Sequence, residues 1–246
     1  LAVLYGLGDT ARADVVIPAV GLSRRAGDGT QAIYALYLQA DVYRGQGNFA
    51  QALEVGREML AQAEARQDRQ AALLAHYTLG ATALYGGDIC QARAELEGTL
   101  RLCRDDEDRL LAALIGLDFH TMTLIWLSLA LWFLGDVEQS TDQARLALSL
   151  AQKRAEPLTW ATALAMVIWL WLYSGSDEDV RPWVETLQRL VDENRIELLR
   201  PWAGTHYGWL LAGRGQVAEG VAQMRRNILN WRQGSTALGR PMLLAA

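Results

Sequence analysis

The sequence predicts an all-α protein built as a solenoid of about six antiparallel helical hairpins. The first observation is a repeated break, a glycine usually followed by a polar residue, that returns at intervals near 40 residues. The second is the composition, which is 51% hydrophobic with only five prolines among 246 residues and therefore suits helices. The third is a small residue midway along the helices of several hairpins, which lets paired helices pack closely.

The hairpin is clearest in residues 76–102, HYTLGATALYGGDICQARAELEGTLRL. Gly80 in its first helix and Ala92 in its second have little bulk, so the two helices are expected to approach closely. Gly87 can adopt a positive φ where the first helix ends, and Asp88 can accept hydrogen bonds from the free N–H groups of the second. Local sequence therefore specifies this hairpin.

The break recurs along the whole chain, at spacings of 39, 40, 48, 40 and 40 residues. Its glycines are Gly8, Gly47, Gly87, Gly135, Gly175 and Gly215. The long interval is explained by about eight extra residues near 105–108, which we predict to form a loop or short helix. A fixed period of this length is typical of stacked supersecondary units.

Taken in order, residues 1–26 form a first hairpin whose second helix is interrupted by Pro18. The next hairpins are predicted at 30–67, 69–104, 118–154, 157–194 and 196–233, and residues 238–246 begin a seventh. The second helix of the fifth hairpin is expected to begin at residue 177. Pro157 opens the fifth hairpin, because proline is tolerated in the first turn of a helix. We expect residues 1–246 to form one repeat domain, and the chain to be a fragment of a larger protein.

Residues 157–176 carry no charge over twenty positions and so meet the length criterion for a membrane span. They occupy a first-helix position in the repeat, however, and the neighbouring first helices contain charges and histidine. A central helix of a solenoid can be apolar nearly all round. We therefore expect a buried helix, with no membrane as a partner.

Charge and cysteine content limit the other partners. A net charge of -5 argues against nucleic acid, and the one basic cluster, Arg225, Arg226 and Arg232, is interpreted as a solvated helix face. Cys90 and Cys103 lie about 20 Å apart on one predicted helix and cannot pair with each other. Without a signal peptide, this favours a cytoplasmic location.

No catalytic motif stands out. The only lysine, Lys153, lacks the glycine-rich context of a phosphate-binding loop. The three histidines fall in different hairpins, so we predict no metal site and no cofactor. We expect no enzyme activity within these residues.

The distribution of aromatic residues is the most informative functional signal in the sequence. All nine tryptophans lie in the second half of the chain. Aligning the hairpins on their turn glycines places aromatic and polar side chains at first-helix positions that face the inner side of such a solenoid. Repeat proteins bind ligands there, and Trp and Tyr are frequent anchors of recognition sites. The predicted groove residues are Tyr37, Asp41, Arg44, Tyr77, Trp126, Trp132, Trp169, Tyr173, Trp202, His206 and Trp209. The alternative is that these side chains only fill the gaps between helices.

The positions of Gly80, Gly87, Asp88 and Ala92 resemble the tetratricopeptide pattern, although the period of 40 exceeds the usual 34. The match is poorer in the fifth and sixth hairpins, where the packing positions hold Ile168 and Val180, and Gly208 and Gly220, respectively. The segments LSLALWFLGDVEQS and LNWRQGSTALGRPMLL are similar to the C-terminal repeats of large bacterial signalling ATPases, some with an adenylate/guanylate cyclase domain, and of ligand-sensing transcription activators. The resemblance implies a right-handed superhelix.

The resemblance also implies a non-catalytic scaffold that binds a protein or peptide partner, or senses a small-molecule effector, for a larger signalling ATPase. Any ATPase or cyclase activity would then lie outside these residues. The alternative is a structural module or free-standing adaptor, which associates with another domain or forms a homo-oligomer.

Overall fold

The structure is a computed structural model, and it describes residues 14, 16, 18, 21, 29–104, 108, 112, 116–174 and 179–233. Over these residues it is all-helical, without a strand. The first four helices with bounds are α3 (Gly29–Gly45), α4 (Phe49–Arg66), α5 (Arg69–Gly86) and α6 (Ile89–Leu102). The next four are α8 (Phe119–Phe133), α9 (Val137–Arg154), α10 (Pro157–Ser174) and α11 (Arg181–Glu193). The last are the 3₁₀ turn η1 (Glu197–Leu199), α12 (Arg200–Gly213) and α13 (Val217–Gln233).

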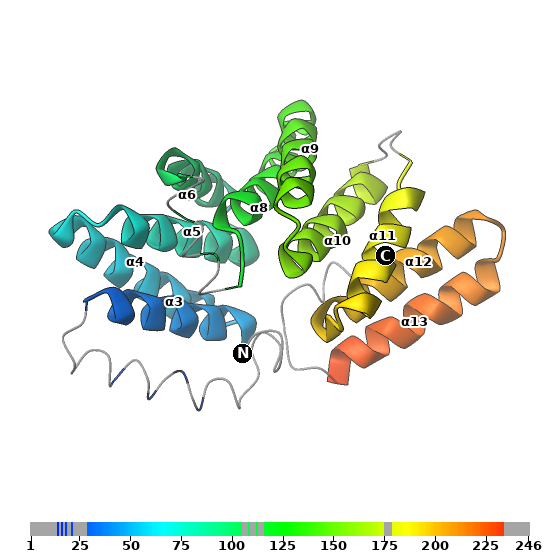
Figure 1. Ribbon diagram of the computed structural model, residues 1–246, viewed down its shortest axis with the longest axis horizontal. Helices are drawn as coiled ribbons and strands as arrows, with labels where there is room; N and C mark the ends of the chain where they lie inside the picture. The colour runs from blue at the N-terminus through cyan, green and yellow to red at the C-terminus, as the bar shows by residue number, and fades with distance from the viewer. Residues whose placement is uncertain are drawn as a thin grey trace.

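Each helix packs against the next one along the chain (Figure 1). In addition, the first helices of successive pairs contact one another in the order α3, α5, α8, α10 and α12. The second helices, α4, α6, α9, α11 and α13, contact mainly the first helices beside them. The core therefore runs along the layer of first helices, and in α8 every residue from Thr121 to Leu131 is buried.

The turn glycines behave as predicted wherever the structure describes them. Gly47, Gly87, Gly135 and Gly215 have φ values of 79°, 89°, 85° and 86°, in the left-handed region where a side chain would be strained. Gly8 and Gly175 lie outside the described residues. These four glycines allow the chain to reverse immediately after each first helix.

Aspartates begin the following helices by accepting backbone N–H groups. The Asp88 carboxylate accepts from Gln91 N at 3.0 Å, as predicted, and Asp68 accepts from Ala71 N at the same distance. Asp118 and Asp136 cap α8 and α9 in the same way. Asn48, at the equivalent place before α4, makes no side-chain capping bond.

Small residues set the closest helix crossings. A Cβ atom added to Gly80 would lie 2.8 Å from Leu96 Cγ, so the glycine is needed for α6 to approach α5. Between α12 and α13 the approach involves the backbone, because a Cβ on Gly220 would lie 2.4 Å from Gly208 O. The two glycines assigned to packing positions in the sixth hairpin thus face each other directly.

Two helices begin later than the sequence suggested. Helix α11 starts at Arg181, not near residue 177, and α12 starts at Arg200 after the 3₁₀ turn instead of at residue 196. Pro182 and Pro201 stand in the first turns of these helices, where their missing N–H groups leave no intrahelical bond unmade. Proline therefore fixes both starting points. The same chemistry at Pro157 opens α10 as predicted.

Helix α10 is the one helix among the described residues that is long and apolar enough to cross a membrane. More than half of its residues are buried within the protein, against α8, α9, α11 and α12. This is the environment of a core helix, in agreement with the interpretation drawn from the repeat. The cytoplasmic location remains a prediction.

Candidate functional site

The eleven residues predicted to line a groove all lie on first helices, but they fall into three separate groups. Tyr37, Asp41, Arg44, Tyr77 and Trp126 lie on α3, α5 and the middle of α8. Trp132, Trp169 and Tyr173 lie towards the C-terminal ends of α8 and α10, and Trp202, His206 and Trp209 lie on α12. Their exposure to solvent differs strongly between the groups.

The first group belongs to a cluster that joins three helices and is buried except for Tyr85, which is partly exposed. The ring centroids of Tyr37 and Tyr77 lie 6.5 Å apart, and Phe119 packs edge-on against both, at 5.5 Å and 4.9 Å. On the other side of Tyr77, the indole Nε1 of Trp126 donates a hydrogen bond to the Tyr77 hydroxyl at 2.9 Å. The Trp126 ring also packs edge-on against Tyr85 at 5.7 Å. We call these five rings, Tyr37, Tyr77, Tyr85, Phe119 and Trp126, the inner cluster.

Phe119 was not among the predicted site residues. It is the first residue of α8, directly after the capping Asp118, and its sequence position gives no sign that it reaches both α3 and α5. The local signal was the cap, which fixes where α8 begins and thus which side chain starts the helix. The contact itself depends on how three pairs of helices are arranged in space.

A buried ion pair lies beside the inner cluster. Arg44 and Asp41, one turn apart on α3, pair with each other and are 5% and 4% exposed. Burial is the largest influence on the pKa of Arg44 and lowers it, but the Asp41 carboxylate and three nearby tyrosines together outweigh burial. The pKa is therefore raised, and the guanidinium stays charged. Burial also raises the pKa values of Tyr77 and Tyr85, which remain protonated phenols. In the described part of the chain, Arg44 Nη1 has no hydrogen-bond partner.

The second group forms a strip of rings that reaches the surface. Trp132 packs edge-on against Trp169 at 5.8 Å, and Trp169 stacks on Tyr173 at 4.8 Å. Trp132 also contacts Phe133 at 5.1 Å, and Phe133 is 51% exposed. We call these four residues, Trp132, Phe133, Trp169 and Tyr173, the aromatic strip. Its last ring, Phe133, is more exposed than any ring of the inner cluster.

The strip also carries a polar group without a hydrogen-bond partner among the described residues. The Tyr173 hydroxyl is buried and has no hydrogen-bond partner among the described residues. Burial raises the pKa of this phenol, so it stays protonated and can donate. A buried donor without an acceptor costs free energy. Beside Phe133, Leu134 and Val137 expose further apolar surface at the turn between α8 and α9.

In the third group, only one side chain is accessible. Trp202 and His206 are buried with ring centroids 6.0 Å apart, and His206 Nε2 lies 2.9 Å from the Ala165 carbonyl oxygen on α10. Because that oxygen can only accept, Nε2 carries the proton. Burial lowers the pKa of His206 to about 4, so the imidazole is neutral at pH 7. Trp209, two turns after Trp202 on α12, is 40% exposed.

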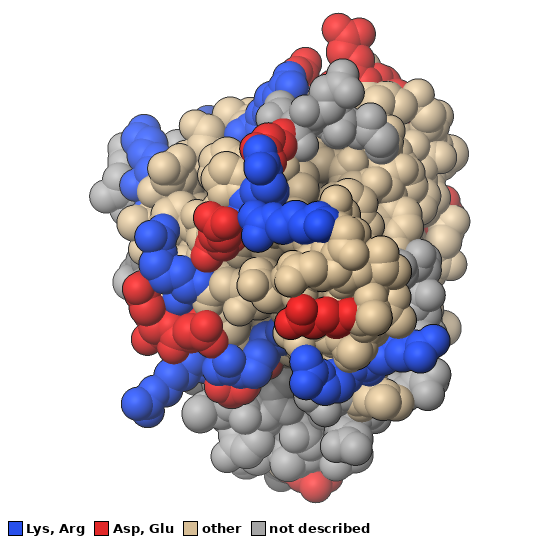
Figure 2. Space-filling model, turned by 90° about the vertical axis from the view of Figure 1, so that its right-hand side faces the viewer, with Lys and Arg blue, Asp and Glu red and all other residues tan. Residues whose placement is uncertain are grey.

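The charged surface carries both signs in close alternation. Figure 2 shows Lys and Arg side chains interspersed with Asp and Glu on the face formed by the C-terminal helices. Arg200, for example, pairs with Asp192 and with Glu197 at 2.7 Å each. Among the described residues, no group of His, Cys, Asp and Glu is arranged to hold a metal ion. The arrangement supports recognition through aromatic contacts more readily than through a basic surface.

Comparison of the chain with protein-family models and with curated proteins finds no match.

Proposed function

We propose that the chain is a tetratricopeptide-like repeat domain that acts as a non-catalytic binding scaffold within a larger signalling or regulatory ATPase. The domain would cover residues 1–246 as a right-handed superhelix with a period near 40 residues. The partner is a protein or peptide, or a small effector, that contacts the layer of first helices. Binding would be transmitted along the array to the rest of the protein.

The arrangement of the helices supports the repeat architecture. In a curved array of hairpins, the helices on the inner side are brought closer together than those on the outer side. Here α3, α5, α8, α10 and α12 contact one another in series, whereas successive second helices make little contact. This difference is what an inner layer of first helices requires.

The single observation that carries the binding role is the aromatic strip. Phe133 exposes half of its surface. It contacts Trp132, which packs against Trp169, and Trp169 stacks on Tyr173. Aromatic side chains present a large apolar area with few rotatable bonds and therefore anchor many recognition sites. At the other end of the strip, the partly exposed Tyr173 carries a hydroxyl donor without an acceptor among the described residues. Together they suit a ligand with an apolar part and a hydrogen-bond acceptor.

The test is a thermal-shift screen of the chain against a peptide library and a library of small metabolites, followed by titration of each hit. Hits are then measured with Phe133→Ala and with Leu146→Ala, a matched control because Leu146 is also about half exposed but lies on α9. We expect the affinity of genuine hits to fall only in Phe133→Ala. If every hit binds both variants equally, the strip is not the binding site.

A second candidate function is self-association, which the exposed apolar turn favours. Phe133, Leu134 and Val137 lie close together in sequence and are each more than a third exposed. Contiguous exposed apolar residues often mark protein interfaces. Light scattering of the chain and of Val137→Asp separates the two roles: a concentration-dependent dimer that Val137→Asp dissolves favours a structural module, and a monomer at all concentrations excludes it.

A further inference from the structure

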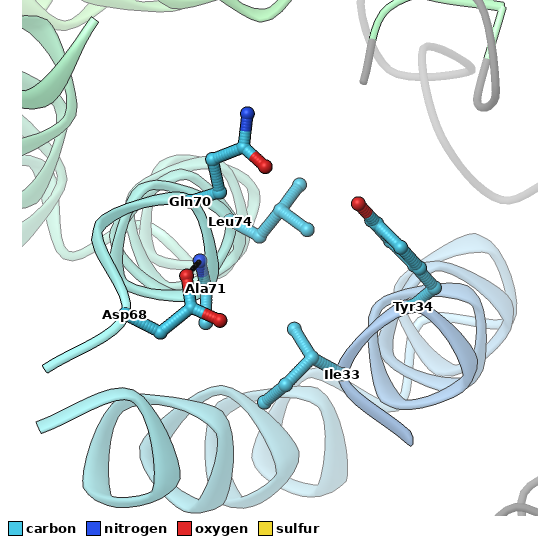
Figure 3. A pocket seen from close by; sticks show the side chains of 6 residues that line it. All are labelled: Ile33, Tyr34, Asp68, Gln70, Ala71 and Leu74. Atoms are coloured by element: carbon cyan, nitrogen blue, oxygen red, sulfur yellow. Dashed lines mark hydrogen bonds between the residues drawn. The ribbon is translucent and has the colours of Figure 1, made fainter. Parts of the chain in front are cut away.

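A small pocket lies between the N-terminal parts of α3 and α5, about one helical turn before the inner cluster (Figure 3). Its volume is about 20 Å³, and it is lined by Ile33, Tyr34, Asp68, Gln70, Ala71 and Leu74. Ile33, Ala71 and Leu74 are buried apolar side chains that form its floor. Tyr34, Asp68 and Gln70 form a polar rim around the opening.

The rim presents oxygen atoms and a negative charge. In Figure 3 the Asp68 carboxylate and the Tyr34 hydroxyl both face the space between the helices. One Asp68 oxygen accepts the Ala71 N–H, which fixes the carboxylate in position. The Asp68 charge raises the pKa of Tyr34 in addition to the larger effect of burial, so this phenol is a neutral hydroxyl that can accept a hydrogen bond.

Among the described residues, no basic side chain forms an ion pair with the Asp68 carboxylate. The adjacent Arg69 is engaged by Asp108, at 2.8 Å. The N-terminus of α5 contributes a partial positive charge of about half a unit, which offsets only part of the carboxylate charge. Among the described residues that line it, the pocket therefore carries one carboxylate that is only partly offset, above an apolar floor.

We propose that this pocket binds a primary ammonium group on a short aliphatic stem. An ammonium head is similar in size to a water molecule, and a cavity of about 20 Å³ is large enough for one such group. Asp68 provides the charge and the Tyr34 hydroxyl accepts a second hydrogen bond. The ammonium head fills the pocket, and the stem extends out through the opening. A planar guanidinium is too large for this volume, and an anion is repelled by Asp68. The group is supplied by a small free amine or by a lysine side chain of a partner.

The backbone amide of Ala71 is a direct reporter, because it donates to Asp68. Butylammonium chloride is titrated into the ¹⁵N-labelled chain, and the Ala71 amide signal is followed. We expect a saturable shift with a Kd on the order of 1–10 mM, since a ligand of so few atoms gains little contact energy. Butanol, which has the same stem without a charge, should produce no comparable shift.

Asp68→Asn keeps an oxygen that can cap α5 but removes the charge. We expect it to weaken butylammonium binding by about tenfold. Asp88→Asn is the matched control, because Asp88 caps α6 in the same geometry and lies outside the pocket. This control should leave the affinity unchanged. Tyr34→Phe provides a second variant that removes only the hydroxyl, and it should weaken binding by about threefold.

N-acetyl-lysine amide identifies the source of the amine. If it binds more tightly than butylammonium, the pocket takes a lysine side chain of a partner; if only butylammonium binds, it takes a small free amine. An unshifted Ala71 signal, equal binding of butanol, or full affinity in Asp68→Asn would each overturn the proposal and leave a pocket that holds water alone. Because the pocket lies outside the aromatic strip, these results are independent of the proposed function.

Discussion

The inner cluster and the aromatic strip are built from the same residue types on the same layer of helices, yet they end differently. In the inner cluster, rings from α3, α5 and α8 meet each other, and the Trp126 indole donates to the Tyr77 hydroxyl. In the strip, the rings come from α8 and α10, the Tyr173 hydroxyl has no acceptor among the described residues, and Phe133 reaches solvent. Rings from three helices shield most of the inner cluster from solvent, whereas rings from two helices leave the aromatic strip exposed at Phe133.

The largest expected difference between the two regions is in stability. Trp126→Ala removes a buried ring and leaves a cavity, so we expect the free energy of unfolding to fall by about 3–5 kcal/mol. Phe133→Ala removes a half-exposed ring and should reduce it by less than about 1 kcal/mol. Urea denaturation of the two variants measures both values. Equal losses would mean that the two regions do not differ in packing.

The third group of predicted groove residues, which contains His206, should make the stability of the chain sensitive to acid. His206 has a folded pKa of about 4, below its ordinary value of 6.5, so the unfolded chain binds a proton more readily between these pH values. Stability conferred by the neutral imidazole is present above pH 6.5 and is lost as the pH falls, by about 3 kcal/mol at pH 4. His206→Gln cannot bind this proton. The wild-type chain should therefore lose more stability than this variant between pH 7 and pH 4, and parallel pH curves would contradict the assignment.

The crossing of α12 and α13 should tolerate no added atom. Gly220→Ala places a methyl group against the Gly208 carbonyl, and we expect a loss of about 1–3 kcal/mol in unfolding free energy. Gly213→Ala is the control, because no atom lies within 4 Å of its added Cβ. That variant should be neutral or slightly more stable, since alanine favours helix. Thermal unfolding of both distinguishes a close crossing from a loose one.

Much of this fold could be predicted from the sequence because its signals are local. Gly47, Gly87, Gly135 and Gly215 each mark a turn that needs a positive φ, and Asp88 marks a helix start; both depend on a few neighbouring residues. The later starts of α11 and α12 could also have been found, because Pro182 and Pro201 are as diagnostic as Pro157.

The candidate site was harder to predict, because exposure depends on contacts between distant helices. The sequence placed Tyr77 and Trp132 on the same face of successive first helices, but it contains no signal for the distance between those helices. Phe119 closes the space next to Tyr77 from 42 positions away in the chain, and no equivalent ring covers Phe133. The residue types predicted which side chains lie on the layer of first helices. Only the structure shows that the inner cluster is mostly shielded from solvent and that the aromatic strip is exposed at Phe133.

The smallest expected effects compare two tyrosine hydroxyls. Tyr77→Phe leaves the buried indole N–H of Trp126 without its acceptor, so we expect a loss of about 1–3 kcal/mol. Tyr173→Phe removes a hydroxyl that is already unpartnered among the described residues, and it should be neutral or stabilising. Urea denaturation resolves the two. A stability loss at Tyr173 as large as that at Tyr77 would show that the Tyr173 hydroxyl has an acceptor.

The central claim is that one layer of first helices is closed around the inner cluster and open at the aromatic strip. Hydroxyl-radical footprinting of the unmodified chain, read by mass spectrometry, measures the accessibility of each aromatic side chain directly. We predict strong labelling of Phe133 and Trp209 and protection of Tyr37, Tyr77 and Trp126. Labelling of the inner cluster at the level of Phe133 would contradict the account.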